Sequence, residues 1–352
     1  MMPAEPPALH APVRLKLDSD ALVSNWRALA KKSGSALCGA AVKADGYGLG
    51  ARAVVKRLAA EGCKDFFVAH WREAEKISDL VPSEQISVLN GLTAVDTVAA
   101  RKIGAVPVLN TKEQIATWKA AGGGRCHVML DTGINRLGIG PEQLSSELLD
   151  GLDIDILMSH LASADEDSEQ NERQRVLFGE MSAGIDCKRM SLANSAGIML
   201  GTGYHFDLTR PGLSLYGGIA RPEMEGVISP VVSIEARVLQ VRSLQANDPV
   251  GYNATFECPS DMPVATIALG YADGYLRAFS NNGCAKFDGK ALPVIGRVSM
   301  DLVTLDASLA PDLREGDWVS IDYDLEGASE TSGLSQYELL TGLGDRFDRI
   351  WE

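Results

Sequence analysis

The residues best placed for chemistry are a lysine and a tyrosine four positions apart, Lys43 and Tyr47, in the stretch AVKADGYG. Lys43 ends an apolar run and precedes a tight DGYG turn, a position that would strip part of the water from its amine. Desolvation lowers the pKa of a lysine and leaves a free amine that can attack an aldehyde. A solvated charge is the alternative, and it is the more common state of an isolated lysine.

Two later stretches could bind a phosphate attached to such an aldehyde, as in pyridoxal phosphate. In NSAG, Asn194 and Ser195 stand where a helix would begin, and the Ser195 hydroxyl could reach a phosphate. In RPGL, Gly212 and Leu213 could offer backbone N–H groups directly after Arg210. Asn-Ser is also a common plain helix cap. Its combination with Lys43 favours a pyridoxal phosphate site.

Alternating apolar strands and amphipathic helices through the first two-thirds of the chain must position these residues. Continuous apolar strands indicate burial on both faces, which is typical of a parallel sheet. Eight such strands favour a (β/α)8 barrel, or TIM barrel, over a doubly wound sheet. The predicted strands span residues 37–43, 65–70, 86–90, 105–110, 126–131, 153–160, 188–194 and 205–210.

A second domain is indicated after about residue 230, where strands joined by short turns replace the alternation. One helix, in SQYELLTGLG, is expected to interrupt these strands. We predict a cofactor-binding barrel over residues 13–232 and a mostly β domain over residues 233–352, to which residues 1–17 could contribute.

The active site of such a barrel lies at the carboxyl ends of its strands. Polar residues end strands in many proteins, but here nearly every strand delivers one to the same rim, which favours a site. The predicted strand ends supply Lys43, His70, Asn90, Asn110, Asp131, His160, Asn194 with Ser195, and Arg210.

Composition excludes several other classes. The net charge of -14 disfavours nucleic-acid binding. No apolar run approaches the roughly 20 residues that span a bilayer, so no membrane partner is expected. The N-terminal stretch MMPAEPPALHAPVR lacks a signal-peptide core and is expected to be a short frayed arm. Six cysteines and five histidines show no zinc spacing, so we expect no metal, reduced thiols and a cytoplasmic protein.

The chain resembles the alanine racemase family, pyridoxal-phosphate enzymes with a barrel and a C-terminal β domain. The resemblance covers nearly the whole chain, and it is specific because the motifs occur together in the family's order. These motifs are VKADGYGLG, LDTGINRLG, SHLASADE, LANSAG, LTRPGLSLYG, VGYNATF, GYADGY and GRVSMD.

The resemblance implies roles around the cofactor. Lys43 would carry it covalently, and Arg210 would face the pyridine nitrogen. The phosphate site would consist of Tyr47, Asn194, Ser195 and the backbone of Gly212 and Leu213.

The resemblance also implies residues around the substrate, a small amino acid. Arg136 would reach the substrate carboxylate and the cofactor ring oxygen. Tyr252 would act from the partner subunit of a homodimer with shared active sites, and His160 would hydrogen-bond to it. The partner's copies of Tyr271, Met300 and Asp301 would line the substrate entrance.

Racemisation requires this set because the α-proton leaves one face and returns on the other, which calls for two opposed groups. Lys43 would serve the D face and Tyr252 the L face. A phenol is a weak base at neutral pH, so positive charge and His160 would have to stabilise the phenolate. Arg210 can only donate, so it would leave the pyridine nitrogen unprotonated and disfavour side reactions such as transamination. The expected activity is interconversion of L- and D-alanine, supplying D-alanine for the cell wall.

Three positions depart from the family pattern. Met129 stands where many members have a carbamylated lysine that holds the arginine numbered 136 here, so Arg136 would be held by another carboxylate, by a bound anion, for which chloride is our hypothesis, or by nothing. Asp345 aligns with a tyrosine that lies near the phosphate in some members. Asn253 follows Tyr252 where glycine is common, which bears on substrate preference.

Three rival functions remain, and several polar residues have ordinary structural explanations. The rivals are a racemase of serine or another small amino acid, a non-catalytic pyridoxal-phosphate carrier, and a decarboxylase. The second domain speaks against the carrier and Arg210 against the decarboxylase. Asp131 and Asp273 are expected to hold turns, His70 and Asn110 to pack at the rim, and His127 to be a core or surface residue.

Overall fold

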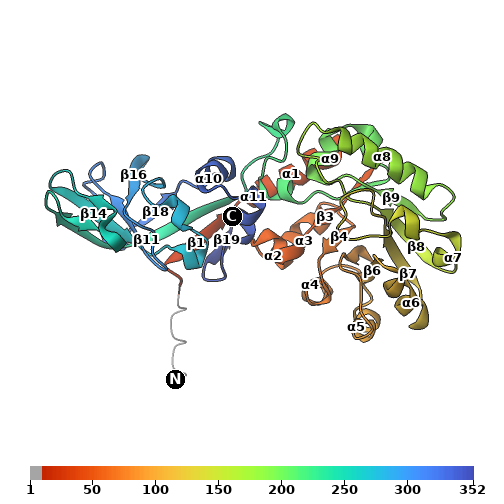
Figure 1. The fold of residues 1–352 in the computed structure, drawn as a ribbon. Helices are drawn as coiled ribbons and strands as arrows, with labels where there is room; N and C mark the ends of the chain where they lie inside the picture. The colour runs from red at the N-terminus through yellow and green to blue at the C-terminus, as the bar shows by residue number, and fades with distance from the viewer. Residues whose placement is uncertain (1–9) are drawn as a thin grey trace, which may run out of the picture. The chain divides into compact units, whose positions relative to one another are not determined.

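The computed structural model describes residues 10–352, so most of the predicted N-terminal arm lies outside the described residues. The chain forms two compact units (Figure 1). One unit comprises Asp20–Ser229, and the other joins the N-terminal segment through Ser19 to Pro230–Glu352.

The first unit is the predicted (β/α)8 barrel. Seven strands form one parallel sheet in sequence order: β3 (Ala40–Ala41), β4 (Phe66–Val68), β5 (Ile86–Val88), β6 (Val106–Leu109), β7 (Arg125–Met129), β8 (Asp153–Met158) and β9 (Arg189–Ser191). The eighth strand, β10 (Leu208–Thr209), pairs in parallel with β2 (Leu37–Cys38), which precedes β3. Backbone bonds from Arg210 N to Ala193 O (2.8 Å) and from Ala41 N to Pro211 O (2.9 Å) close the ring.

Helices follow most of the strands, and their apolar residues recur at helical spacing. In α3 (Ala51–Ala60) the buried residues include Val54, Val55 and Leu58, which face the core. The other helices of this unit are α1 (Ser19–Lys32), α2 (Lys43–Tyr47), α4 (Trp71–Ile77), α5 (Asp96–Ile103), α6 (Lys112–Ala120), α7 (Ser146–Leu149), α8 (Glu169–Ser182) and α9 (Ser195–Met199). Short 3-10 turns occur at Ser83–Gln85, Pro141–Gln143, Thr202–Tyr204, Leu213–Tyr216 and Pro222–Met224. No helix within residues 10–352 has the length and apolar character needed to cross a bilayer.

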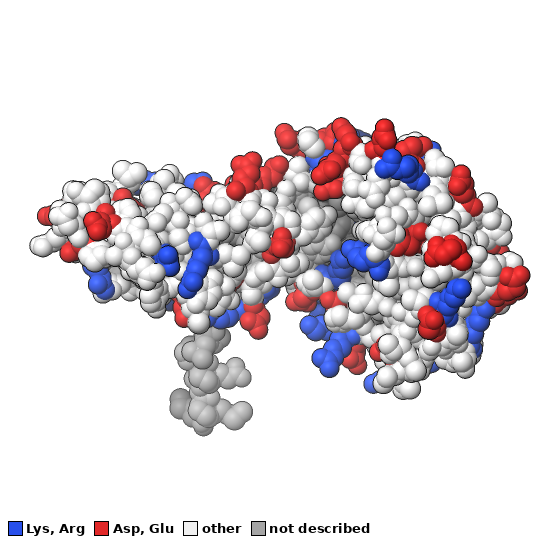
Figure 2. All heavy atoms as spheres, viewed as in Figure 1, with Lys and Arg blue, Asp and Glu red and all other residues white. Residues whose placement is uncertain are grey.

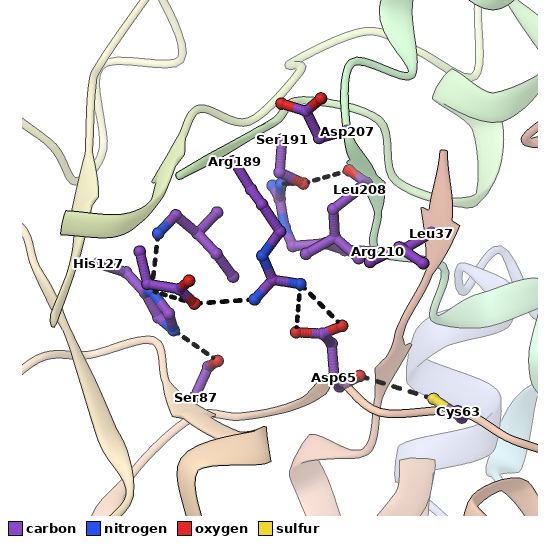
Figure 3. Close-up of polar contacts among 12 residues, drawn as sticks. Leu37, Cys63, Asp65, Ser87, His127, Arg189, Ser191, Asp207, Leu208 and Arg210 are labelled. Carbon is purple, nitrogen blue, oxygen red and sulfur yellow. Dashed lines mark hydrogen bonds and ion pairs between the residues drawn. The ribbon is translucent and has the colours of Figure 1, made fainter. Parts of the chain in front are cut away.

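A network of charged side chains lies near the amino ends of the barrel strands, and Figure 3 shows Arg189 extending to Asp65 within it. The Arg189 guanidinium donates to Asp65 at 3.0 Å and to Asp155 at 2.8 Å. Arg125 donates to the same Asp155 carboxylate at 2.7 Å. Two buried carboxylates thus face two arginines, so the charges compensate one another where hydration is lost.

His127 lies buried beside this network, as a core residue of β7. Its Nδ1 accepts the Ile156 N–H at 3.1 Å, which leaves the ring proton on Nε2, 3.0 Å from the Ser87 hydroxyl. Burial lowers the pKa of His127 from 6.5 to about 3, against the opposing attraction of Asp155. The imidazole is therefore neutral at physiological pH.

The second unit is built on a mostly antiparallel sheet of eight strands, ordered β14-β17-β16-β15-β18-β11-β1-β19, with an added pairing of β14 to β11 and a parallel pairing of β1 to β19. The long strand β11 (Val232–Leu244) contacts β1 (Val13–Leu17), β14 (Met262–Ile267) and β18 (Trp318–Ile321). The remaining strands are β12 (Pro249–Val250), β13 (Phe256–Glu257), β15 (Cys284–Phe287), β16 (Lys290–Ile295), β17 (Val303–Asp306) and β19 (Asp348–Trp351).

Two features of this unit add to what the sequence indicated. Residues 13–17, assigned from the sequence both to the barrel and to a contribution toward the β domain, pair with β11 and β19 in this sheet. Two late helices are present, α10 (Leu325–Ser332) and α11 (Gln336–Thr341), where the sequence predicted one. Asp324 caps α10 by accepting the Gly327 N–H at 2.9 Å, and an aspartate at this position is a local signal for a helix start.

Both units carry mixed surface charge. Figure 2 shows acidic and basic side chains interspersed over the visible face, with no continuous basic surface on that face.

The buried neutral His127 predicts a pH dependence of stability. Its pKa is about 3 in the folded protein and near 6.5 when unfolded, so between these values the unfolded chain binds a proton that the native state does not. The contribution of the neutral His127 to the free energy of unfolding is fully present above pH 6.5. It is lost as the pH falls toward 3, by up to about 1.4 kcal/mol for each pH unit. Denaturant unfolding at several pH values should show that the free energy of unfolding decreases less steeply with falling pH in His127→Asn than in wild type.

His70→Asn is the matched control, because the His70 side chain is exposed. It should follow the wild-type pH dependence. Identical slopes for His127→Asn and wild type would contradict the assignment of a neutral His127.

Candidate active site

Lys43 lies at the rim of the barrel, directly after the first strand, and the backbone behind it turns in the left-handed sense. Ala44, Asp45, Gly46 and Tyr47 have φ values of 53°, 53°, 65° and 54°. Each non-glycine residue in this region costs roughly 1–2 kcal/mol, and such strain is characteristic of functional sites. The segment labelled α2 is therefore a left-handed turn that reverses the chain immediately after the amine.

The Lys43 amine is partly buried among other cations. Burial lowers its pKa, Arg136 and Arg210 lower it further, and Glu73 opposes the effect. This is the direction predicted from the sequence, and it increases the fraction of free amine at neutral pH.

Arg210 has no carboxylate partner among residues 10–352. Its side chain is only 7% exposed, and it donates to the Ser159 carbonyl at 2.6 Å and to the Ser191 hydroxyl. The Asp207 carboxylate, three residues before Arg210, does not pair with it and accepts the Met190 N–H at 2.7 Å. Burial lowers the pKa of Arg210 to about 10, so it stays charged at neutral pH.

His160 follows strand β8 and shares the electrostatic environment of Lys43. The pKa of His160 is lowered from 6.5 to about 3, mainly by burial. The positive charges of Arg210, Arg136 and Lys43 lower it further. The mutual effects of these four groups place them in one neighbourhood. The His160 carbonyl accepts a bond from the Gln174 side chain at 2.9 Å, so the buried Gln174 of α8 fixes this strand end.

Arg136 projects from a turn that Asp131 organises. The Asp131 carboxylate accepts the N–H groups of Gly133 (2.9 Å), Asn135 (3.1 Å) and Arg136 (3.1 Å), which confirms its predicted role in holding the turn. Within residues 10–352 no carboxylate contacts the exposed Arg136 guanidinium. Met129 is buried at the end of β7 and carries no charge that could hold it.

Ser195 and the loop after Arg210 form a concentration of hydrogen-bond donors. The Ser195 Oγ accepts the N–H of Gly212 at 2.9 Å and that of Ser214 at 3.3 Å. Asn194 caps α9 by accepting the Gly197 N–H at 2.8 Å, and so positions Ser195 at the helix start. Leu213 begins the 3-10 turn Leu213–Tyr216 between these groups.

Tyr47 lies against this loop. Its ring stacks on Tyr216 with centroids 4.6 Å apart, and the Tyr216 hydroxyl donates to the Ala41 carbonyl at 2.8 Å. A Cβ atom at Gly212 would clash with the Tyr47 hydroxyl and lie 3.0 Å from its Cζ. The absence of a side chain at Gly212 therefore brings the Tyr47 hydroxyl to the loop that carries the donor groups.

The remaining predicted site residues lie in the second unit, called the β unit below. Tyr252 is 67% exposed, in the 3-10 turn Tyr252–Ala254, and Asn253 after it has φ 61°. Met300 is 52% exposed, and its carbonyl accepts the Ala272 N–H at 3.0 Å, which ties it to the turn Tyr271–Asp273. The structure therefore brings Met300 and Tyr271 together and presents Tyr252 on the surface of its unit.

Asp301 and Asp273 share one arginine that the sequence did not single out. Arg346 donates to Asp301 at 2.7 Å and to both oxygens of the buried Asp273, at 2.7 and 2.8 Å. Asp273 also accepts the Gly270 N–H at 2.9 Å, so its predicted role in holding the turn is confirmed. The neighbouring Asp345 is exposed.

Other strand ends serve the scaffold. The buried Asn110 donates to the carbonyls of Leu89 and Val108 at 3.0 and 2.8 Å. His70 occupies the N-cap position of α4, and Asn90 accepts through its carbonyl from Gln114 at 3.1 Å. The sequence did not indicate three residues that support the site, Glu73, Gln174 and Ser191. No local pattern shows which distant group a polar side chain will contact.

The barrel rim thus combines a partly buried amine, a buried arginine without a carboxylate partner in the described chain, a neutral histidine and a donor-lined loop. An amine of lowered pKa can bond to an aldehyde carbon, and the loop donors suit an anionic oxygen group. A group that carries both an aldehyde and a phosphate fits this arrangement.

Comparison with known families gives matches over both units. The family model described as alanine racemase, N-terminal domain, matches residues 17–220, and that for the C-terminal domain matches residues 231–351. The alanine racemase of Acidiphilium cryptum is 39% identical over 351 residues, covering 96% of this chain and 98% of its own. A catabolic alanine racemase of Rhizobium johnstonii is 42% identical over 358 residues, covering 95% and 93%.

Solved structures show the same similarity. Alanine racemase from Bartonella henselae, crystallised with covalently bound pyridoxal phosphate, superimposes with a TM-score of 0.90 at 34% identity, covering 97% of this chain and 99% of that one. The biosynthetic alanine racemase from Pseudomonas aeruginosa gives a TM-score of 0.88 at 29% identity, covering 98% and 100%.

The contact between Gly212 and Tyr47 predicts a coupled effect of mutation. Gly212→Ala should destabilise the protein by about 1–3 kcal/mol, because the stacked Tyr47 ring has little room to move. In a Tyr47→Phe background the clashing oxygen is gone, so the cost should be smaller. Denaturant unfolding of the single and double variants measures the coupling.

Gly203→Ala is the control, since a Cβ there meets only Arg175 Cδ at an ordinary 3.7 Å. An equal cost of Gly212→Ala in both backgrounds would refute the contact.

Proposed function

The chain belongs to the alanine racemase family, and on that basis we propose that it is a pyridoxal-phosphate-dependent racemase that interconverts L- and D-alanine with Lys43 and Tyr252 as its two bases. The observation that carries the proposal is the Lys43 amine, which burial and two arginines depress in pKa at the rim of a barrel. The β unit, which carries Tyr252, supports a racemase over a cofactor carrier.

The residues present fit pyridoxal phosphate. Lys43 offers the amine for the aldehyde. The Ser195 hydroxyl, the backbone N–H groups of Gly212 and Leu213, and the adjacent Tyr47 hydroxyl would offer donors for the phosphate, with the Gly212 N–H leaving the Ser195 Oγ that it contacts at 2.9 Å. Because Gly212 leaves no Cβ between them, these groups can converge on one anion, with Asn194 and Leu213 framing the loop. When bound, the cofactor supplies an electron sink that acidifies the α-proton of an amino acid.

Arg210 supports racemisation over other reactions of this cofactor. Its guanidinium is buried and charged, and it bonds to Ser159 and Ser191, so it can donate but cannot accept a proton. Placed at the pyridine nitrogen, it would leave that nitrogen without a proton. A decarboxylase would be expected to use a carboxylate there instead.

The two bases act on opposite faces of the α-carbon. Lys43 would remove or return the proton on the D face when its amine is free of the aldehyde, and its lowered pKa would suit it to exchange protons at neutral pH. Tyr252 of the partner subunit would do the same on the L face, which its exposure on the β unit allows. His160, neutral by burial, would accept or donate one hydrogen bond to that phenol.

Arg136 would bind the substrate carboxylate, because its exposed guanidinium is not engaged by a carboxylate of the described chain. A bound anion such as chloride is our proposed replacement for the missing carbamylated lysine at Met129. The partner's entrance would be lined by Tyr271, Met300 and Asp301, with Arg346 fixing Asp301.

This assignment implies a homodimer in which each active site takes residues from two chains. We assign the enzyme to D-alanine supply for the cell wall, in the cytoplasm, where its six free cysteines would stay reduced. Its relatives include both catabolic and biosynthetic racemases.

Subunit complementation tests the two-base site directly. Lys43→Ala and Tyr252→Phe should each lower L-alanine racemisation by about 100-fold or more, because each loses one proton-transfer group. A heterodimer of the two variants should recover about half of the wild-type rate, since one of its two sites combines the intact Lys43 and Tyr252. Differently tagged, co-expressed chains allow the heterodimer to be isolated and assayed for D-alanine.

A heterodimer of Lys43→Ala with the wild-type chain is the control and should also retain about half of the rate. No recovery in the double heterodimer would reject a Tyr252 contribution across subunits. Faster conversion of L-serine than of L-alanine by the wild type would reject alanine as the preferred substrate.

A further inference from the structure

Glu73 is joined to the turn that holds Lys43, although it lies on a different element. Its Oε1 accepts the Ala44 N–H at 2.7 Å, and its Oε2 accepts the Ala69 N–H at 2.7 Å. Ala44 is the residue directly after Lys43, and Ala69 follows the neighbouring strand β4. One carboxylate therefore bridges the carboxyl ends of two adjacent barrel strands, β3 and β4.

This geometry differs from an ordinary helix cap. Glu73 is the third residue of α4, where a glutamate commonly accepts the N–H of the N-cap residue itself. Here it accepts from Ala69, one residue before the N-cap His70, and extends its second oxygen to another loop. The capping function alone does not explain the bond to Ala44.

The bond to Ala44 acts where the backbone is strained. Ala44 begins a run of five residues with positive φ, Ala44 to Gly48, and two of the other bonds in this turn run from Gly46 N to Val42 O (2.9 Å) and from Gly48 N to Ala44 O (2.8 Å). A carboxylate that accepts the first N–H of the run stabilises a conformation that Ala44 disfavours. The direction in which the Lys43 side chain leaves the barrel depends on this conformation.

The charge of Glu73 acts on the same lysine. Its side chain is 13% exposed, so its field is less screened than that of a surface carboxylate. The charged or titratable groups around Lys43 are Arg136, Arg210, His160 and Glu73, and His70 Nε2 lies 3.9 Å from the Glu73 Oε1. Among them Glu73 is the acidic group, and it opposes the effect of the two arginines on the amine.

We propose that Glu73 is a positioning residue for Lys43, which clamps the left-handed turn behind the amine and places a negative charge beside it. The importance of this role for catalysis rests on the function proposed above. Glu73 touches neither substrate nor cofactor in this account, and it acts only through the backbone and the charge of Lys43.

The test compares Glu73→Gln, Glu73→Asp and the control Glu75→Gln in full-length protein freed of cofactor. Glu75 is an exposed glutamate of the same helix. Two quantities are measured: amide hydrogen exchange of residues 44–50, and the pH dependence of Lys43 acetylation by acetic anhydride, followed by peptide mass spectrometry.

Both Glu73 variants should exchange faster than wild type at residues 44–50, because neither can accept both N–H groups. The pH of half-maximal acetylation should fall in Glu73→Gln, which lacks the charge, giving roughly threefold to tenfold faster labelling at neutral pH. Glu73→Asp keeps the charge, so its half-maximal pH should stay near the wild-type value. Glu75→Gln should match wild type in both measurements.

If the amides of residues 44–50 exchange in Glu73→Gln at the wild-type rate, the proposed clamp is overturned. The electrostatic role would be overturned if the pH of half-maximal Lys43 acetylation in Glu73→Gln were equal to or higher than in wild type. It would also be overturned if Glu73→Asp lowered this pH as much as Glu73→Gln does. Neither readout requires a bound cofactor or turnover. A failure of the proposed racemase activity would therefore leave the result on Glu73 and Lys43 interpretable by itself.

Discussion

The site depends on keeping one amine only partly hydrated beside fixed positive charge. Lys43 leaves the first barrel strand where Arg210 is buried without a carboxylate partner within residues 10–352 and where Arg136 adds a second cation. Each of these factors shifts the lysine toward its neutral form, and Glu73 limits the shift. A solvated lysine at the same rim would be almost fully protonated at neutral pH and unable to attack an aldehyde.

The fold imposes this environment through the backbone more than through side-chain packing. Five consecutive residues after Lys43 adopt positive φ, so the chain reverses within one turn and carries Tyr47 against Gly212. The same reversal brings the Tyr47 hydroxyl to the loop in which the Ser195 Oγ accepts two backbone N–H groups. The proposed covalent anchor and the proposed phosphate donors therefore both depend on one local conformation, whose strain is offset by hydrogen bonds from neighbouring elements.

The sequence was sufficient to locate the barrel strands and their polar ends, because buried parallel strands leave a continuous apolar pattern. It also predicted that Lys43, Ser195 and Arg210 lie just beyond strand ends, since glycine and proline turns mark where strands end. The family resemblance alone singled out Tyr252, which has no distinctive local pattern. The placement of Tyr252 opposite the cofactor remains a proposal.

Other features depend on contacts distant in sequence and could not be predicted. Ala44 has little intrinsic preference for left-handed backbone, and the bond to Glu73 together with the closing bonds of the turn stabilises it in that conformation. The network of Asp65, Asp155 and Arg189 joins three strands that no local pattern connects. Likewise, pairing of β1 with β11 joins residues 13–17 to a strand more than two hundred positions later.

The central claim is that the Lys43 amine is the covalent attachment point of the cofactor, and borohydride reduction of the purified holoenzyme tests it most directly. Reduction makes the bond between the amine and the cofactor's aldehyde carbon permanent, and peptide mapping then locates the pyridoxyl group. The account predicts a single modified peptide carrying the group on Lys43. A pyridoxyl group on any other lysine, or none on a protein that is active as a racemase, would contradict it.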